Sequence, residues 1–138
     1  MDFVGYNRHM TILGIDFGTK RVGVAISDTT ETLAFPKDTF QNNSELIASI
    51  ADICKKETIR MIVLGQSLNL KGEENLVMED IRKFKVEIEE NIKLPVIFQQ
   101  EYFSSFEAGR FQGITGGLDA SAAAIILQRF LDKKRANE

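Results

Sequence analysis

Asp16 interrupts an apolar run in the stretch ILGIDFGTKRVGVAIS. An ionised carboxylate that is buried without a partner costs several kcal/mol, so a cation or a hydrogen-bond donor must compensate it. The glycine turn that follows carries Lys20 and Arg21, and two further acids, Glu101 and Asp119, lie where apolar segments end or begin. These five residues are the first candidates for a charged functional site.

The order of the expected strands and helices decides whether the acids can meet. Strands are expected at residues 11–17, 21–27, 32–40, 59–65 and 95–101. Helices are expected at 42–57, 73–91 and 116–134, and a capping box of Ser104 and Glu107 predicts a further short helix. Short turns between the first three strands predict an antiparallel meander, and apolar strands joined by helices are typical of parallel pairing. The sequence therefore predicts an α/β fold with a mixed five-stranded sheet, in the order βββαβαβαα, and helices on both faces.

The candidate acids fall near one rim of this sheet. Chemistry in such sheets gathers beyond the carboxyl ends of the parallel strands. Asp16 lies near the end of the first strand and Glu101 closes the fifth, so both carboxylates emerge on one rim if the two strands are parallel and close together. Asp119 joins them if the last helix begins against that rim. Three acids without a base between them repel one another and raise at least one pKa, a conflict that a bound divalent cation removes.

Oxygen ligands favour Mg²⁺ or Mn²⁺ as that cation. The chain has a single histidine, His9, and a single cysteine, Cys54, which argues against a zinc site. Cys54 falls on the apolar face of an expected helix, which indicates packing rather than chemistry. Two ions about 4 Å apart are the usual arrangement for phosphodiester cleavage, so the three acids predict a nuclease centre.

Each acid also has a structural explanation that needs no metal. Asp16 is placed to cap backbone amides near Gly18. Glu101 fits a solvated strand end, and Asp119 fits a first-turn acid that the helix dipole favours. The functional interpretation therefore depends on the fold bringing the three acids together.

Length and composition indicate a single globular domain over residues 1–138. The chain has 138 residues, 43% hydrophobic and 27% charged, close to the ~150-residue scale of one domain. We expect residues 1–10 to form an extension and residues 133–138 to form a tail. No apolar run approaches the ~20 residues of a membrane span, and the first ten residues lack the pattern of a secretory signal. A cytoplasmic protein without membrane association is therefore expected.

The net charge of −3 and the pI near 5.3 differ from those of a general nucleic-acid binder, whose affinity comes largely from Lys and Arg contacts to phosphates. Local charge must therefore bind such a substrate. Lys20, Arg21 and Asn69 are the candidates for substrate contact, with Lys71 and Arg110 as possible neighbours. For each basic side chain taken alone, a solvated surface position is the simpler interpretation.

Three motifs, GIDFGTKRVGVAISD, IVLGQSLNLKG and LDASAAAIILQRFLD, resemble the YqgF family, also called RuvX, of pre-16S rRNA nucleases and Holliday-junction-resolvase-like proteins. The resemblance runs from Thr11 to Asp132. It implies an RNase H-like fold and a metal-dependent nuclease that matures the 5′ end of small-subunit ribosomal RNA. The family's acidic triad corresponds to Asp16, Glu101 and Asp119. Cleavage of branched DNA is the alternative activity.

The sequence departs from the family pattern beside these motifs. Gln100 and Tyr102 replace charged neighbours of Glu101, Ser67 stands at a usual proline, and Lys71 stands at a usual aspartate. The three acids are kept while the expected substrate surface is altered. A catalytically weak, RNase H-like adaptor in ribosome assembly is therefore a third interpretation.

The first motif also looks like the phosphate-loop hairpin of actin, sugar kinases and large heat-shock chaperones, in which a Gly-Thr turn and an aspartate hold nucleotide phosphates. Those proteins bind the nucleotide between two such domains, and a chain of 138 residues has room for one. ATP binding is therefore not expected.

Overall fold

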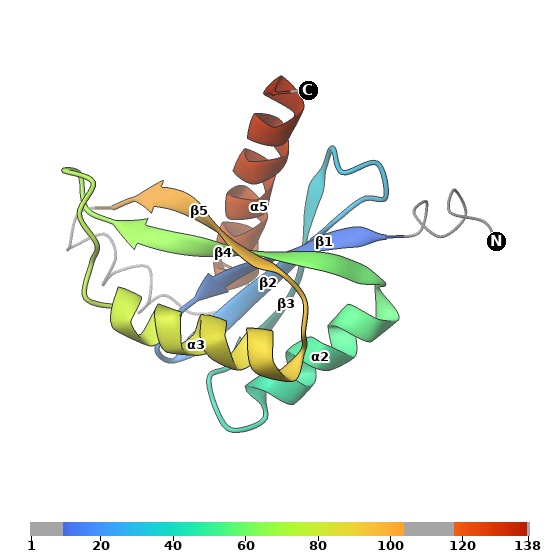
Figure 1. Ribbon diagram of the computed structural model, residues 1–138, viewed down its shortest axis with the longest axis horizontal. Coiled ribbons are helices and arrows are strands. Elements are labelled where there is room, and N and C mark those ends of the chain that lie inside the picture. The colour runs from blue at the N-terminus through green and yellow to red at the C-terminus, as the bar shows by residue number, and fades with distance from the viewer. Residues whose placement is uncertain (1–9, 104–117, 138) are drawn as a thin grey trace.

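The computed structural model describes residues 10–103 and 118–137, which form a five-stranded sheet with helices on both faces (Figure 1). The elements in chain order are β1 (Thr11–Phe17), β2 (Arg21–Ser27), β3 (Ala34–Gln41), α2 (Leu46–Lys56), β4 (Ile59–Leu68), α3 (Met78–Asn91), β5 (Val96–Tyr102) and α5 (Leu118–Ala136). The strand order is β3-β2-β1-β4-β5, with β1 antiparallel to β2 and parallel to β4, β3 antiparallel to β2, and β5 parallel to β4. The mixed sheet expected from the sequence is confirmed.

Side chains of β1 alternate between two apolar layers. Ile15 and Phe17 pack in the layer that includes α2 and α3, whereas Ile12 packs in the layer of α5. The same alternation turns Gly14 and Asp16 toward α5. The acid that interrupts the apolar run therefore faces α5, while its two neighbours fill the opposite layer.

Small residues let α5 approach the sheet closely. Ala120 and Ala123 of this helix are buried, and Ala124 is partly buried. A Cβ atom on Gly14 would lie 2.7 Å from the Cβ atom of Leu127. This close packing fixes α5, and with it Asp119, against the middle of the sheet.

β4 is longer than the sequence predicts. The sequence pattern predicts an end at Gly65, whereas the strand runs to Leu68. Its last three residues pair with the end of β5, where Ser67 lies opposite Glu101. Gln66 and Ser67 interrupt the apolar pattern of the strand, but the ladder with β5 satisfies the backbone N–H and C=O groups of this segment.

α3 begins later than expected, at Met78 rather than at Glu73. Asn75 folds back on the end of β4 instead: its backbone N–H donates to the carbonyl of Ser67 at 3.0 Å, and its Nδ2 donates to Ser67 Oγ at 2.9 Å. These tertiary contacts override the helix propensity of the preceding acidic residues.

α5 continues through Ala136, so residues 133–136, expected in a tail, are helical. Lys134 on this last part of the helix lies 3.2 Å from a carboxylate oxygen of Glu31, in the turn before β3. Within residues 10–103 and 118–137, none of the helices is both long enough and apolar enough to cross a membrane.

Several expectations concern residues outside the described ranges. These are the capping box of Ser104 and Glu107, the neighbouring Arg110, and His9 in the expected extension. Cys54 is described and buried, and burial raises the pKa of its thiol to about 11. The packing role expected for this cysteine is confirmed.

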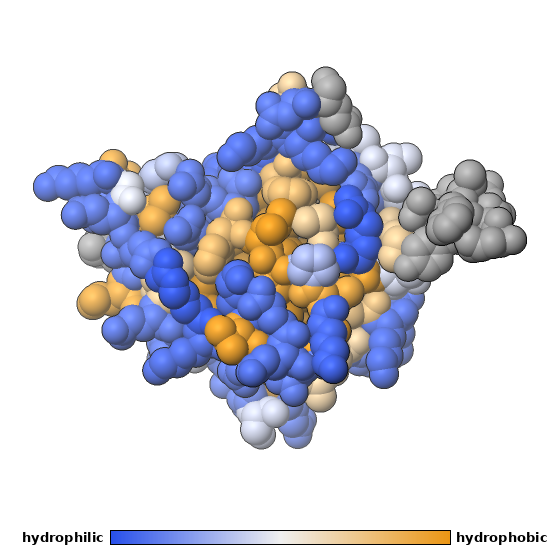
Figure 2. Space-filling view, viewed as in Figure 1, coloured by the Kyte–Doolittle hydropathy of each residue, from blue (hydrophilic) through white to orange (hydrophobic). Residues whose placement is uncertain are grey.

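The two edges of the sheet differ. The edge strand β3 carries Pro36 and Lys37, residue types that discourage pairing with another chain. At the other edge, apolar side chains gather over β5 between α5 and α3, surrounded by polar ones (Figure 2). Ile97 of β5 is an exposed residue of this edge.

Candidate active site

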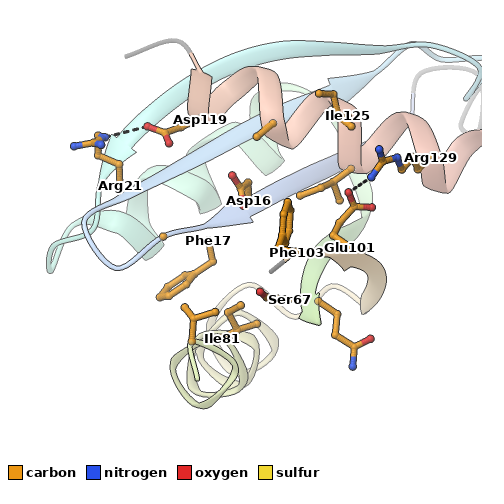
Figure 3. A pocket seen from close by; sticks show the side chains of 16 residues that line it. Asp16, Phe17, Arg21, Ser67, Ile81, Glu101, Phe103, Asp119, Ile125 and Arg129 are labelled. Carbon is orange, nitrogen blue, oxygen red and sulfur yellow. Dashed lines mark hydrogen bonds and ion pairs between the residues drawn. The ribbon is translucent and has the colours of Figure 1, made fainter. Parts of the chain in front are cut away.

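The three acids that the sequence singled out line one pocket (Figure 3). Asp16 comes from the end of β1, Glu101 from β5 and Asp119 from the first turn of α5. The pocket measures about 170 Å³, room for a few water molecules at about 30 Å³ each. Apolar side chains form much of the remaining wall: Phe17, Val77, Ile81, Phe103, Ile125 and Ile126.

Backbone pairing sets the positions of these acids. Asp16 pairs with Gly23 across the β1–β2 ladder, and the backbone of Asp119 lies against Gly23 so closely that no side chain would fit between them. Glu101 pairs with Ser67 of β4, the strand that separates β5 from β1. Because β1, β4 and β5 run parallel, their carboxyl ends share one rim, as the sequence predicted.

Asp16 lies where ionisation is disfavoured. Burial, followed by the negative charges of Asp119 and Glu101, raises the pKa of Asp16 from 3.8 to about 7. In Figure 3 its carboxylate lies between two ion pairs, each of which holds one of the other acids. A carboxylate in these surroundings gains free energy when a cation binds beside it.

Glu101 is almost completely buried, with 3% of the residue exposed. Nη1 of Arg129 donates to its Oε1 atom. Its Oε2 atom has no hydrogen-bond partner within the described part of the chain. Burial raises the pKa of Glu101, and the guanidinium of Arg129 opposes that rise. A buried carboxylate oxygen without a partner is costly, and a cation or donor that reached it would bind favourably.

Asp119 is also buried and is held by the first hairpin. Nε of Arg21 donates to its Oδ2 atom at 3.0 Å, across 98 positions of sequence. Arg21 itself lines the pocket, as a candidate for substrate contact should. Its guanidinium therefore orients an acid of the site, whatever else it binds.

As the side chains stand, no three acidic, histidine or cysteine residues in 10–103 and 118–137 form a metal site. Asp119 and Glu101 each point to an arginine, with Asp16 between them (Figure 3). The donor set nevertheless suits a hard divalent ion, because all the donors are carboxylate oxygens and one of them, Oε2 of Glu101, is buried and has no hydrogen-bond partner among residues 10–103 and 118–137. Ion binding here would require side chains to move.

Two further predicted contact residues do not line the pocket. Lys20 is exposed in the turn between β1 and β2. Asn69 organises the loop after β4, since its Oδ1 accepts the backbone N–H groups of Lys71 and Glu73, both at 2.9 Å. Asn69 therefore has a role in the turn, and substrate contact by Asn69 or Lys20 stays a prediction.

Arg129 is the charged pocket residue that sequence reasoning missed. Asp119, Ala122, Ile126 and Arg129 all line the pocket, and their spacing of three or four residues puts them on one face of α5. That spacing was a usable signal. Ser67 also lines the pocket, but it does so through the pairing of β4 with β5, which local sequence does not reveal.

The fold is RNase H-like, as two similar solved structures show. The chain is similar to T. thermophilus RuvC in complex with a Holliday junction substrate, with a TM-score of 0.56 and 11% identity over 92% of this chain and 96% of that one. It is also similar to Fowlpox virus resolvase in complex with Holliday junction DNA, with a TM-score of 0.51 and 12% identity over 91% and 99% of the two chains. At 11–12% sequence identity, this similarity is evidence for the fold alone. The predicted RNase H-like fold is confirmed.

The chain is a member of the RuvX family, whose model, described as "RuvX: Holliday junction resolvase", matches residues 10–133. It is 36% identical to a protein of Maridesulfovibrio salexigens, over 88% of this chain and 98% of that protein. It is 34% identical to a protein of Caldanaerobacter subterraneus, over 91% and 99%. Both relatives carry the name "Putative pre-16S rRNA nuclease". The family membership predicted from the three motifs is confirmed.

Proposed function

We propose that this chain is a nuclease that hydrolyses phosphodiester bonds in structured precursor ribosomal RNA, in the cytoplasm. Asp16, Glu101 and Asp119 would hold Mg²⁺ or Mn²⁺. One observation carries the proposal: carboxylates from three distant segments line a single pocket, in which Oε2 of Glu101 is buried and has no partner among the described residues. The names of the relatives support RNA as the substrate class.

The structural explanations of Glu101 and Asp119 account less well for the burial of these two acids. A solvated strand end would leave Glu101 exposed, and a first-turn acid that only favours the helix dipole would not need to be buried at Asp119. Burying acids near one another is unfavourable unless a ligand compensates them. A cation bound between the acids would offset this cost.

The residues of the pocket have separate tasks in this proposal. Divalent ions bound there would supply Lewis-acid activation of the phosphate and of the attacking water. Burial and the neighbouring acids raise the pKa of Asp16 to about 7, so a divalent ion bound beside its carboxylate would relieve an unfavourable ionisation. The ion pair with Nε of Arg21 sets the orientation of Asp119, and this pair would have to open for Asp119 to bind an ion. The apolar wall formed by residues such as Phe17 and Ile81 lowers the local dielectric constant and so strengthens each electrostatic contact.

A cleavage assay on two matched substrates tests the proposal. The purified chain is incubated with a structured fragment of precursor rRNA or with a four-way DNA junction, in Mg²⁺, in Mn²⁺ or in a chelator. We expect cleavage of the RNA that requires a divalent ion and is absent in Asp16→Asn. Asp52→Asn, which neutralises an exposed carboxylate of α2, should cleave as the parent does.

Branched DNA is the second candidate substrate, because the matching family model is described as a Holliday junction resolvase. Cleavage of the junction in preference to the RNA would favour it. RNA binding without cleavage in either ion would favour the third interpretation, an RNase H-like adaptor in which the altered residues Gln100, Tyr102, Ser67 and Lys71 have removed activity.

A further inference from the structure

Arg129 and Glu101 are unequal partners at one end of the pocket. The side chain of Glu101 is 4% exposed and that of Arg129 is 59% exposed. Glu101 is held by β5, where it pairs with Ser67 of β4, so it cannot follow a partner that moves away. The guanidinium reaches the carboxylate from the solvent side on a long side chain. Arg129 can therefore leave the pair without disturbing the sheet.

The pair leaves the charge of Glu101 only partly compensated. Arg129 contacts Oε1, whereas Oε2 has no hydrogen-bond partner in the described part of the chain. A buried carboxylate is stabilised more when both of its oxygens are satisfied. A hard divalent ion accepts carboxylate oxygens singly or in pairs, so it would compete with the guanidinium for Glu101.

A released guanidinium has a second use at this position. Its N–H donors bind a phosphate in the same forked geometry in which they bind a carboxylate. Arg129 lines the pocket from the face of α5 that carries Asp119, about 15 Å further along the helix. In Figure 3 the Arg129–Glu101 pair and the Arg21–Asp119 pair lie on opposite sides of Asp16. A nucleic-acid backbone at the pocket would therefore meet Arg129 at one end of its path.

Arg21 is less suited to such an exchange. Its side chain is 21% exposed, compared with 59% for Arg129, and its partner Asp119 keeps 10% of its side chain exposed. Arg21 also begins a strand inside the sheet, whereas Arg129 lies on a helix surface. The two ion pairs of the pocket thus have different expected roles.

We propose that Arg129 and a divalent ion are alternative partners of Glu101, and that ion binding releases the Arg129 guanidinium to a phosphate of the nucleic acid. The inference rests on the proposed function, because it needs both ligands. Arg129 then opposes ion binding, and it contributes to nucleic-acid binding only when the ion is present.

Two affinities of the full chain test the exchange. Calorimetry measures binding of Mn²⁺ alone, and fluorescence anisotropy measures binding of a structured RNA hairpin in Ca²⁺ or in a chelator. Arg129→Gln should bind Mn²⁺ roughly three- to tenfold more tightly and, in Ca²⁺, bind RNA more weakly by a similar factor. Its salt slope in Ca²⁺ should be shallower by about 0.7–0.9. In the chelator both proteins should bind RNA equally, because Glu101 retains the guanidinium of the parent.

Two further variants separate the exchange from loss of charge. Arg129→Lys keeps a cation beside Glu101, so its Mn²⁺ affinity should lie closer to that of the parent than the affinity of Arg129→Gln does, and its contribution to RNA binding should still require Ca²⁺. Arg135→Gln removes the same charge from the same helix at a residue that does not line the pocket. It should leave Mn²⁺ affinity unchanged, and any effect on RNA binding should be the same with and without Ca²⁺. Thermal unfolding checks that every variant is folded.

Four results would overturn the inference. An equal loss of RNA affinity in Ca²⁺ and in the chelator would make Arg129 a permanent phosphate contact. Unchanged Mn²⁺ affinity in Arg129→Gln would mean that the guanidinium does not compete with the ion. A parent that binds neither Mn²⁺ nor RNA would overturn the proposed function as well, whereas a parent that binds both while Arg129→Gln matches it would overturn the exchange alone.

Discussion

The backbone carbonyl of Asp119 lies against Gly23 so closely that a Cβ atom on Gly23 would overlap the carbonyl oxygen. Gly23 in turn pairs with Asp16 across the β1–β2 ladder. One glycine therefore sets the spacing between the acid of the first strand and the acid of the last helix. Because the obstacle is backbone, no change of rotamer can relieve the overlap.

Gly23→Ala should displace the start of α5, lower the free energy of unfolding by roughly 3 kcal/mol and abolish cleavage. Gly14→Ala is the matched control, since its Cβ atom would meet Leu127 at 2.7 Å in the same layer without touching an acid. Urea unfolding measures stability, and cleavage is measured where both variants are folded. If the two variants lost activity equally, Gly23 would act through the general packing of α5 on the sheet and not through its contact with Asp119.

Asp16→Asn should abolish cleavage and, in the presence of a chelator, stabilise the fold at high pH. The pKa of Asp16 is about 7 in the folded protein against an ordinary 3.8, so ionising it between these values opposes folding. The free energies of unfolding of the variant and the parent should be equal near pH 4. The margin in favour of the variant should then grow up to pH 8, to a few kcal/mol, since each pKa unit corresponds to about 1.4 kcal/mol.

Urea unfolding at pH 4, 6 and 8 measures this margin, with Asp52→Asn as the control that changes an exposed carboxylate. A margin that did not change with pH would show that Asp16 does not titrate as its surroundings imply. An active Asp16→Asn protein would remove the acid from the proposed reaction.

Asp28→Ala should lower Tm at pH 7 by a few degrees and leave cleavage unchanged. The carboxylate of Asp28 accepts the backbone N–H groups of Thr32 at 2.8 Å and Leu33 at 3.2 Å, and the hydroxyl of Thr30 at 2.9 Å. Burial alone would raise the pKa of Asp28, but these hydrogen bonds lower it to about 2. Its contribution is thus complete above pH 3.8 and lost as the pH falls through 2.

Thermal scans from pH 2 to pH 7 check this expectation. The Tm of Asp28→Ala should approach that of the parent as the pH falls, because protonation removes the same hydrogen-bond acceptors from the parent. Parallel pH curves for the two proteins would contradict the role given to this turn.

Lys20→Ala should weaken RNA binding and make the salt slope shallower by about 0.7–0.9, the value of one phosphate contact. Lys20 is exposed in the turn beside Gly18, which lines the pocket. Anisotropy in Ca²⁺ at several salt concentrations measures the slope. Lys55→Ala, an exposed lysine on α2, is the control. If Lys20→Ala and Lys55→Ala gave the same salt slope, the substrate would bind to another part of the surface.

Local patterns in the sequence were enough to predict the sheet and the rim of acids. Turns too short for a crossover forced the first three strands to be antiparallel, and amphipathic helices between the later strands allowed parallel pairing. Alternation along β1 then required Asp16 to lie on one face and its apolar neighbours on the other. Placing Asp16 near Glu101 needed only the rule that parallel strands end on one rim.

Tertiary structure alone decided what each acid touches. Glu101 meets Arg129 and Asp119 meets Arg21 because α5 crosses the sheet at glycines that admit it closely, and no local pattern reports which distant segments will pack together. The extension of β4 to Leu68 likewise depends on its ladder with β5. Propensity reflects the interactions of a residue with its neighbours in the chain, whereas ion pairs and strand ladders take their free energy from groups that only the folded chain brings together.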